Sequence, residues 1–366
     1  MDLEKKVEAI TRNTVEVVTR DDLVKLLVEK EKPRGYIGFE PSGLVHIGWL
    51  VWMFKVRDLV DVGVELYILE ATWHAYINDK LGGDLDLIRK AARYTRRVLE
   101  AVGVPETRVK YVDAEELVSS KEYWALLVRL AKSTSLARVK RALTIMGRAV
   151  SEAESDFSKL IYPLMQVADI FYLDLDIALG GLDQRRAHML ARDLAEKLNL
   201  KKPVALHTPI VSSIRGSQRK IIQISDGSVE VDEVVSEFKM SKSKPETAIF
   251  VHDSPEVVRS KVLSAYCPPR VLEFNPVIEI NKYILFQQPG FVLHVERPSQ
   301  YGGPVDLHSI EELENMYSKG ELHPLDLKNA TAEALVKMLE GIRAKLFSSK
   351  ETTKLLEELI SARITR

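Results

Sequence analysis

The stretch Tyr36-Ile-Gly-Phe-Glu-Pro-Ser-Gly-Leu-Val-His-Ile-Gly-Trp-Leu50 predicts a strand, a turn and the start of a helix. Its first four residues form a short apolar run typical of a buried strand, and Pro41-Ser42-Gly43 interrupts that run. From His46 onward the apolar residues follow helical spacing. A helix start that follows a strand offers free backbone N–H groups and the positive end of the helix dipole, which suits a phosphate group.

Two residues of this helix start are candidates for phosphate chemistry. His46 can donate a hydrogen bond to a phosphate oxygen as negative charge builds there, and Gly48 leaves the backbone open to the close approach of a nucleotide. A turn of this kind follows the first strand of doubly wound proteins in general. A purely structural turn therefore remains an equal alternative from this stretch alone.

Strand and helix patterns alternate along the first part of the chain. Strands are expected at 65–69, 109–112, 175–179 and 204–207, and helices at 85–102, 115–131, 159–173 and 183–198. This alternation predicts an α/β fold, a Rossmann-like doubly wound parallel sheet. Residues 3–30 are expected to hold a charged amphipathic helical stretch, with a helix start at Asp21-Asp22. Residues 71–78 are expected to form a loop, and 212–236 to contain a hairpin around Asp226-Gly227.

The C-terminal part has a different pattern. Ser254-Pro255 is expected to begin a helix, with serine as the N-cap. Further helices are expected at about 275–288, 310–316, 326–347 and 350–362, with a Pro/Gly-rich excursion at 289–306. We therefore expect two domains: a Rossmann-like domain over 1–250, with an inserted helical segment at about 115–150, and a mainly helical domain over 251–366.

Composition narrows the function classes. The 366 residues include 52 basic and 53 acidic side chains, so any contact with nucleic acid must come from a local patch. The single cysteine, Cys267, excludes an intrachain disulfide, and the eight histidines lack ligand spacing, so no structural metal is expected. No signal peptide and no membrane-spanning run is visible, which predicts a cytoplasmic protein with no membrane contact.

The densest basic patch is the segment 132–150. It carries Arg138, Lys140 and Arg141 and contains no acidic residue. Such a run is usually a solvated face. The functional alternative is contact with a phosphate backbone.

A polar stripe marks the helix expected at 159–173. Tyr162, Gln166 and Asp169 fall on one face at helical spacing, and nearly every other position is apolar, so the helix is expected to be buried. Buried polar side chains need partners. A phenol, an amide and a carboxylate that converge favour a pocket for a small polar ligand over a purely structural network.

The stretch Phe238-Lys239-Met240-Ser241-Lys242-Ser243-Lys244-Pro245 is rich in hydrogen-bond donors. Its lysines and serines suit a polyphosphate. As a bare pattern it would be an ordinary solvated turn in most proteins.

These motifs occur together and in order. His46-Ile47-Gly48-Trp49 and Lys239-Met240-Ser241-Lys242-Ser243 resemble the HIGH and KMSKS signatures of the class I aminoacyl-tRNA synthetases. Most of the chain also resembles the archaeal/eukaryotic type of tyrosyl-tRNA synthetase. The stretches that carry this second resemblance are 36–43, 161–169, 180–192, 265–268 and 321–329.

The resemblance implies a tyrosine–tRNA ligase. Such an enzyme activates L-tyrosine with ATP, which brings Mg²⁺, to give tyrosyl-adenylate and pyrophosphate, and then transfers tyrosine to the 3′ end of tRNA(Tyr). It also implies a homodimer with the 115–150 region near the interface, a catalytic domain over 1–250 and an anticodon-binding domain over 251–366.

The resemblance also assigns roles to single residues. Asp169 and Tyr36 would bind the phenolic hydroxyl, and the other tyrosine-binding residues would be Tyr162, Gln166 and Gln184. ATP would contact Gly38, His46, Gly48 and Lys242, with His46, Lys239 and Lys242 as the catalytic set. The acceptor end of the tRNA would contact Arg138, Lys140, Arg141 and Arg185.

Two positions depart from the family pattern. Trp49 replaces the second histidine of HIGH, and Pro304 follows Gly302-Gly303 where the family tends to carry an acidic residue, so the anticodon-reading residues stay open.

Three alternatives are weighed against a tyrosine–tRNA ligase. In a tryptophanyl-tRNA synthetase, the indole would leave Asp169 without a phenol to bind. Another nucleotidylyltransferase would lack KMSKS, and a non-catalytic RNA-binding paralogue would usually have lost a motif residue.

Overall fold

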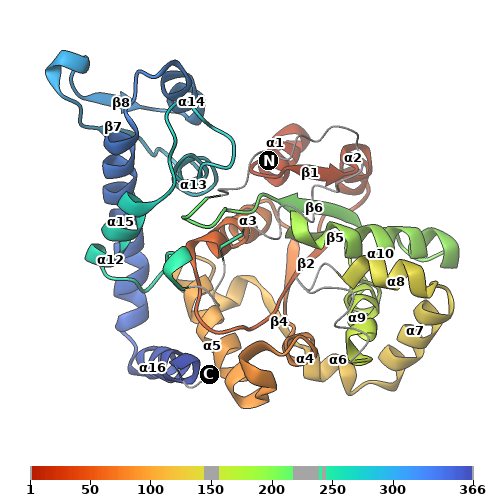
Figure 1. Ribbon diagram of the computed structural model, residues 1–366. Helices are drawn as coiled ribbons and strands as arrows, with labels where there is room; N and C mark the ends of the chain where they lie inside the picture. Colours follow the sequence, from red (N-terminus) through yellow and green to blue (C-terminus); the bar gives the residue numbers. More distant parts are fainter. Residues whose placement is uncertain (1, 144–155, 217–238, 241–244, 365–366) are drawn as a thin grey trace. The chain divides into compact units, whose positions relative to one another are not determined.

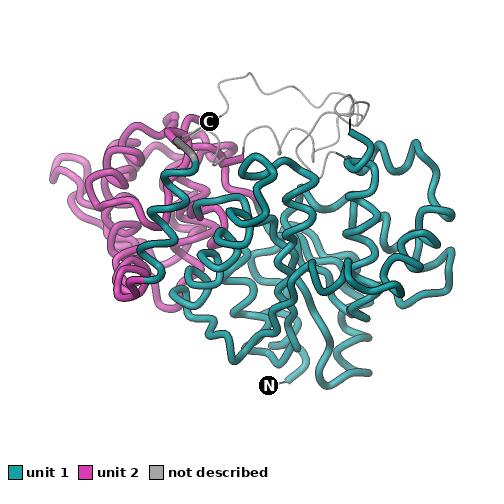
Figure 2. The backbone as a smooth tube through the Cα atoms, turned by 90° about the horizontal axis from the view of Figure 1, so that it is seen from below, with its two compact units in different colours: residues 1–44, 52–209, 351–366 teal, residues 45–51, 210–350 magenta. Residues whose placement is uncertain are grey.

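The computed structural model describes residues 2–143, 156–216, 239–240 and 245–364. The chain divides into two compact units, shown in different colours in Figure 2. Unit 1 contains 1–44, 52–209 and 351–366, and unit 2 contains 45–51 and 210–350. This division follows packing, and the functional boundary at residue 250 stays a prediction.

Unit 1 is built on a six-stranded sheet in its described part (Figure 1). Its order is β1 (Glu16–Val18), β6 (Val204–Thr208), β5 (Ile177–Gly181), β2 (Arg34–Phe39), β3 (Glu65–Glu70) and β4 (Lys110–Asp113). All pairs are parallel except β1 with β6. This confirms the expected α/β class. The chain winds from β2 to β3 and β4 on one side and reaches β5 and β6 on the other. The topological switch point, where sheets of this kind bind ligands, therefore lies at the carboxyl ends of β2 and β5.

Helices cover both faces of this sheet. Alternate residues of β2 point to opposite faces, so they pack against different helices. Tyr36 belongs to a buried cluster with residues of α7, α9 and α10, whereas Phe39 stacks on Trp52 of α3 with ring centroids 6.0 Å apart. The helices that carry residues of unit 1 are α1 (Leu3–Thr11), α2 (Arg20–Glu29), α3 (Leu50–Asp61), α4 (Thr72–Ile77), α5 (Leu85–Ala101), α6 (Ala114–Val118), α7 (Lys121–Lys132), α8 (Leu136–Ala142), α9 (Ser158–Tyr172), α10 (Arg185–Leu198) and α16 (Lys350–Ile364).

Three local expectations were wrong. The segment 3–30 is not one helical stretch, because β1 separates α1 from α2, which Thr19 caps by accepting a hydrogen bond from the Asp22 N–H at 3.1 Å. The expected loop at 71–78 contains α4. The expected helix at 115–131 is two helices, because Ser120 caps a new start for α7. The hairpin around Asp226-Gly227 lies outside the described residues.

Unit 2 is mainly helical, as expected. Its helices are α12 (Pro255–Ser264), α13 (Pro276–Ile280), α14 (Ile310–Lys319) and α15 (Pro324–Phe347), with a π-helical turn over Asn281–Leu285. Ser254 caps α12 as predicted. The Pro/Gly-rich excursion contains an unexpected antiparallel pair, β7 (Leu293–Val295) with β8 (Val305–Leu307). No described helix of the chain is long and apolar enough to cross a bilayer.

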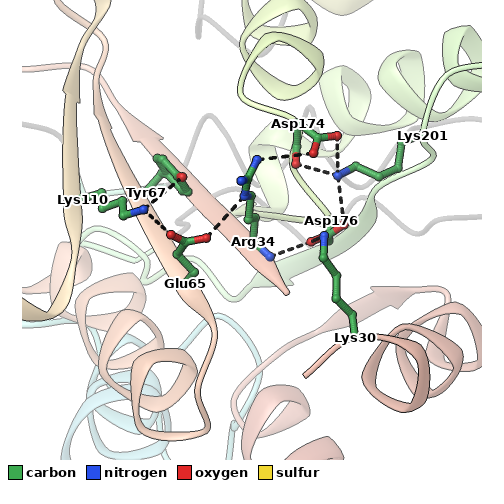
Figure 3. Close-up of polar contacts among 8 residues, drawn as sticks. All are labelled: Lys30, Arg34, Glu65, Tyr67, Lys110, Asp174, Asp176 and Lys201. Atoms are coloured by element: carbon green, nitrogen blue, oxygen red, sulfur yellow. Dashed lines mark hydrogen bonds and ion pairs between the residues drawn. The ribbon is translucent and has the colours of Figure 1, made fainter. Parts of the chain in front are cut away.

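The amino ends of the central strands are joined by an ion-pair network (Figure 3). Asp176, at the start of β5, accepts hydrogen bonds from Lys30 Nζ at 2.7 Å, from the Arg34 backbone N–H at 2.6 Å and from Lys201 Nζ at 3.0 Å. The Arg34 guanidinium reaches Glu65 of β3 at 3.3 Å, and Glu65 also pairs with Lys110 of β4. The network therefore joins four parallel strands, β5, β2, β3 and β4, at their amino ends.

Asp176→Asn is expected to destabilise the protein by roughly 2 kcal/mol at pH 7, because charge-assisted bonds to a buried carboxylate are lost. Burial raises the pKa of Asp176, but the bonds from Lys30, Arg34 and Lys201 outweigh it and lower the pKa below its ordinary 3.8. This stabilisation is therefore present above the ordinary pKa and disappears as the pH falls through the lower folded-state value. Chemical denaturation of both proteins at pH 7 and pH 3 measures it. A constant difference would contradict this assignment.

Candidate active site

The polar stripe of α9 meets the carboxyl ends of β2 and β5. Its deepest member is Asp169, whose side chain is 1% exposed. Oδ1 of Asp169 accepts a hydrogen bond from the Tyr123 hydroxyl at 2.7 Å, and Oδ2 lies 3.1 Å from Nε2 of His74. The carboxylate is therefore hydrogen-bonded from α7 and in close contact with a histidine of α4.

Tyr36 belongs to the same cluster. Burial, followed by the negative charge of Asp169, raises the pKa of Tyr36, and the same two causes raise the pKa of Tyr123. Both phenols therefore keep their protons at neutral pH and can act as hydrogen-bond donors. The pocket combines a buried acceptor with buried donors.

The second end of the stripe is organised by Glu40. The Tyr162 hydroxyl donates to Oε1 of Glu40 at 2.5 Å, and Nδ2 of Asn78 donates to both carboxylate oxygens at 3.0 and 3.1 Å. Lys80 Nζ lies 3.4 Å from Oε2. Because the Tyr162 hydroxyl donates its hydrogen bond to Glu40, its oxygen can act toward a ligand only as an acceptor.

The remaining predicted pocket residues lie nearby. Nε2 of Gln166 donates to Oε1 of Gln184 at 3.2 Å, which links α9 to the turn after β5. A side chain on Gly38 would bring its Cβ within 3.5 Å of the Tyr36 ring, an ordinary contact that would narrow this space. The structure thus brings together all five residues predicted for the amino-acid pocket.

The predicted phosphate-binding residues are held within unit 2. His46 forms an antiparallel bridge with Phe250, the Ile47 N–H donates to the Ile249 carbonyl at 2.8 Å, and the Val251 N–H donates to the Val45 carbonyl at 3.0 Å. The segment that follows the KMSKS stretch therefore anchors the HIGH stretch.

Gly48 has a steric role that its sequence pattern did not indicate. A Cβ on Gly48 would lie 3.0 Å from Cε1 and Nδ1 of His46 and 3.8 Å from Cβ of Val211. Glycine thus leaves room for the imidazole as well as for any ligand. On its other side, the His46 ring meets Trp49 edge-on with centroids 6.3 Å apart.

The KMSKS stretch is described only in part. Lys239 forms an antiparallel bridge with Ser212, and the Met240 N–H donates to the Val211 carbonyl at 3.2 Å. Because Val211 also lies beside Gly48, the first two residues of KMSKS and the HIGH segment share one framework in unit 2. Lys242 lies outside the described residues.

The predicted RNA-contacting cations lie on two helices that pack together. Arg138, Lys140 and Arg141 are on α8 and Arg185 begins α10. Arg138 pairs with Asp193, and Nε of Arg185 lies 2.9 Å from Glu16. Both arginines are more than a third exposed, so the ion pairs orient them without burying them.

Three residues of the pocket were not assigned from sequence. Glu40 lies one residue after β2 and shares the alternation of Tyr36 and Gly38, which is the signal that could have found it. His74 and Tyr123 come from α4 and α7, and no spacing within either helix points to Asp169.

The family model of the class I tRNA synthetases (W and Y) matches residues 29–340. The tyrosine–tRNA ligase of Aeropyrum pernix is 60% identical over 366 residues, covering 100% of this chain and 99% of that protein. The tyrosine–tRNA ligase of Sulfurisphaera tokodaii is 59% identical, covering 98% and 97%.

The chain belongs to the tyrosyl-tRNA synthetases.

Solved structures agree with this family. The crystal structure of tyrosyl-tRNA synthetase from Aeropyrum pernix superposes with a TM-score of 0.87 at 55% identity, covering 99% of this chain and all of that one. A Plasmodium falciparum tryptophanyl-tRNA synthetase, at 18% identity and a TM-score of 0.68, shares the fold alone; the alignment covers 97% of this chain and 91% of that one. The sequence-based prediction of an archaeal-type tyrosyl-tRNA synthetase, and with it a ligase, is confirmed.

Gly48→Ala is expected to lower the rate of tyrosine-dependent ATP–pyrophosphate exchange at least tenfold, because the new methyl group displaces the His46 ring by a few tenths of an ångström or more. The matched control is Gly341→Ala on α15, where an added Cβ meets nothing within 4 Å. Equal activity of the two variants would show that this packing is unimportant.

Proposed function

We propose that the Asp169 pocket binds L-tyrosine and that this contact selects the amino acid. The observation that carries the proposal is a carboxylate 1% exposed, held by Tyr123 and His74 and close to the protonated phenol of Tyr36. Two relatives support it: the tyrosyl-tRNA synthetases from Archaeoglobus fulgidus and Pyrococcus horikoshii, 39% and 38% identical, were solved as complexes with L-tyrosine.

In this arrangement Asp169 accepts a hydrogen bond from the substrate phenol, and Tyr36 donates a hydrogen bond to the phenolic oxygen. Phenylalanine would offer neither group a hydrogen bond while still excluding water from both, and such an unmet hydrogen-bonding site is costly. Tyrosyl-tRNA synthetases are themselves the standard example of discrimination by this effect.

The same pocket suits the other end of the amino acid. The oxygen of Tyr162 is an acceptor because its hydrogen is given to Glu40, and Gln166 and Gln184 add amide oxygens. The negative charge of Glu40 favours an ammonium group nearby. We assign the substrate ammonium to this end.

Adenylate formation needs no activated side chain, since the tyrosine carboxylate is already a nucleophile toward the α-phosphate of ATP. Catalysis then depends on position and on stabilising negative charge. We assign His46, Gly38 and Gly48 to the nucleotide, and Lys239 and Lys242 to the departing pyrophosphate. Mg²⁺ enters as part of the ATP substrate.

Transfer to tRNA(Tyr) uses other surfaces. We assign the cations of α8 and Arg185 to the acceptor end, residues 1–250 to catalysis and 251–366 to the anticodon. The exposed face of α7, with Trp124 43% and Val128 62% exposed at one-turn spacing, is our candidate homodimer contact. We assign the reaction to the cytoplasm.

The tyrosine pocket is tested by ATP–pyrophosphate exchange without tRNA. Asp169→Ala is expected to weaken tyrosine binding at least a hundredfold and to remove most of the preference over phenylalanine, since the buried acceptor is lost. Tyr123→Phe is expected to produce a smaller loss in the same direction, because Asp169 remains but is less firmly held.

The control for the pocket is Tyr111→Phe. Tyr111 lies on β4 under the Arg96 guanidinium, away from the α9 stripe, so its loss is expected to leave exchange unchanged. If Asp169→Ala exchanged tyrosine as well as the parent protein, the assignment of the phenol to this carboxylate would be wrong. Exchange with tryptophan in place of tyrosine would also overturn it.

The acceptor-end surface is tested by comparing charging with exchange. Arg138→Ala combined with Arg141→Ala is expected to reduce tRNA charging about tenfold and leave exchange unchanged, because phosphate contacts are lost. Asp193→Ala removes the same ion pair while keeping Arg138, so it serves as the control and should charge normally. Equal losses of charging and exchange in the double variant would indicate a folding defect.

A further inference from the structure

Glu279 of α13 is a partly buried glutamate outside the pocket and the signature motifs. Its Oε2 accepts the Ser212 backbone N–H at 2.7 Å and its Oε1 accepts the Ser212 hydroxyl at 3.0 Å. One carboxylate thus fixes both the backbone and the side chain of a single residue. Among the described residues, Glu279 has no ion pair.

Ser212 precedes the KMSKS stretch in the sequence and lies beside the first residue of that stretch in the fold. It forms the antiparallel bridge with Lys239, and its neighbour Val211 accepts the Met240 N–H at 3.2 Å. Two residues further on, the Ile214 N–H donates to the Thr247 carbonyl at 3.0 Å. Glu279 therefore holds one side of a strand pair whose other side is Lys239.

Removing the Glu279 carboxylate from water costs free energy, which makes this contact a poor way to stabilise a fold. Burial raises the pKa of Glu279, and the two bonds from Ser212 only partly oppose that effect. A buried carboxylate without a cation costs free energy that an apolar side chain of similar volume would not. Glu279 is a carboxylate shielded from water without a cation beside it in the described part of the chain, and it lies next to a catalytic motif. Such a departure from ordinary packing points to a role in the reaction.

We propose that Glu279 is a positioning residue for Lys239. By fixing Ser212, it sets the strand pair through which the Lys239 backbone is held, and so the place from which the Lys239 ammonium meets the pyrophosphate of ATP. Glu279 itself touches no substrate. The inference rests on the proposed role of Lys239, and it adds a determinant of rate that acts through the backbone.

The test compares three substitutions in the full-length protein by ATP–pyrophosphate exchange. Glu279→Ala is expected to lower kcat about tenfold, since misplacement of a catalytic group by a fraction of an ångström to an ångström has effects of this size or larger. The tyrosine dissociation constant should stay unchanged, because the pocket residues lie in unit 1. Ser212→Ala should give a smaller loss, because it keeps its backbone bond to Glu279.

Glu279→Gln is expected to restore most of the rate. Its amide oxygen can still accept the Ser212 N–H, and its amide hydrogen can be given to the hydroxyl. A merely structural carboxylate would give no such split between kcat and tyrosine binding. If Glu279→Ala fails to fold, Ser212→Ala and Glu279→Gln still carry the comparison.

The structural control is Thr331→Val. Thr331 of α15 accepts a hydrogen bond from Nδ2 of Asn281 at 2.7 Å, two residues beyond Glu279, so its loss removes a buried contact without touching Ser212. It is expected to lower thermal stability and leave kcat unchanged. If Glu279→Ala behaves like Thr331→Val, Glu279 is only structural and the inference is wrong.

A double-mutant cycle separates this inference from the role of Lys239. Lys239→Ala should lower kcat, and adding Glu279→Ala to it should lower kcat little further, because both act through one ammonium. Multiplied effects would show that Glu279 acts independently and would overturn the inference. A Lys239→Ala variant with normal kcat would instead overturn the proposed function of Lys239.

Discussion

The buried carboxylate of Asp169 constrains how the elements around it are arranged. Asp169 lies on a helix that is apolar around most of its circumference, so its charge is tolerated only where donors reach it. Tyr123 of α7 donates a hydrogen bond to it, and Nε2 of His74 on α4 lies 3.1 Å from it. The sheet order serves this requirement, because the pairing of β2 with β5 brings Tyr36 and the turn that bears Gln184 to the same helix.

The features that could be predicted from sequence are those written in local periodicity. Tyr162, Gln166 and Asp169 were found because helical spacing puts them on one face, and the strand-to-helix turn at His46 was found because its apolar pattern changes period. Periodicity fails where an element spans fewer than two of its repeats, which are 2 residues in a strand and about 3.6 in a helix. The three-residue strands β1, β7 and β8 and the six-residue helix α4 carry too few residues to show one.

Contacts between distant segments were the other limit. Tyr123 reaches Asp169 across 46 positions of sequence, and Glu279 reaches Ser212 across 67. Neither pair has a spacing or composition signal. The family resemblance supplied the residues proposed to contact the substrate, yet it did not supply the residues that hold them. Gly48 illustrates the same point, since its clash with a neighbouring imidazole depends on the folded ring position of His46 and could not be read from its motif.

The ion-pair network at the amino ends of the strands has a consequence for temperature. The cost of removing charged groups from water falls as temperature rises, because their hydration carries a strongly negative entropy, whereas apolar burial gains little more. Linked pairs such as Lys30–Asp176–Lys201 thus contribute relatively more in hot solution than in cold. The amino ends of the strands, opposite the pocket, are accordingly the ends at which the strands best keep their register when the protein is heated.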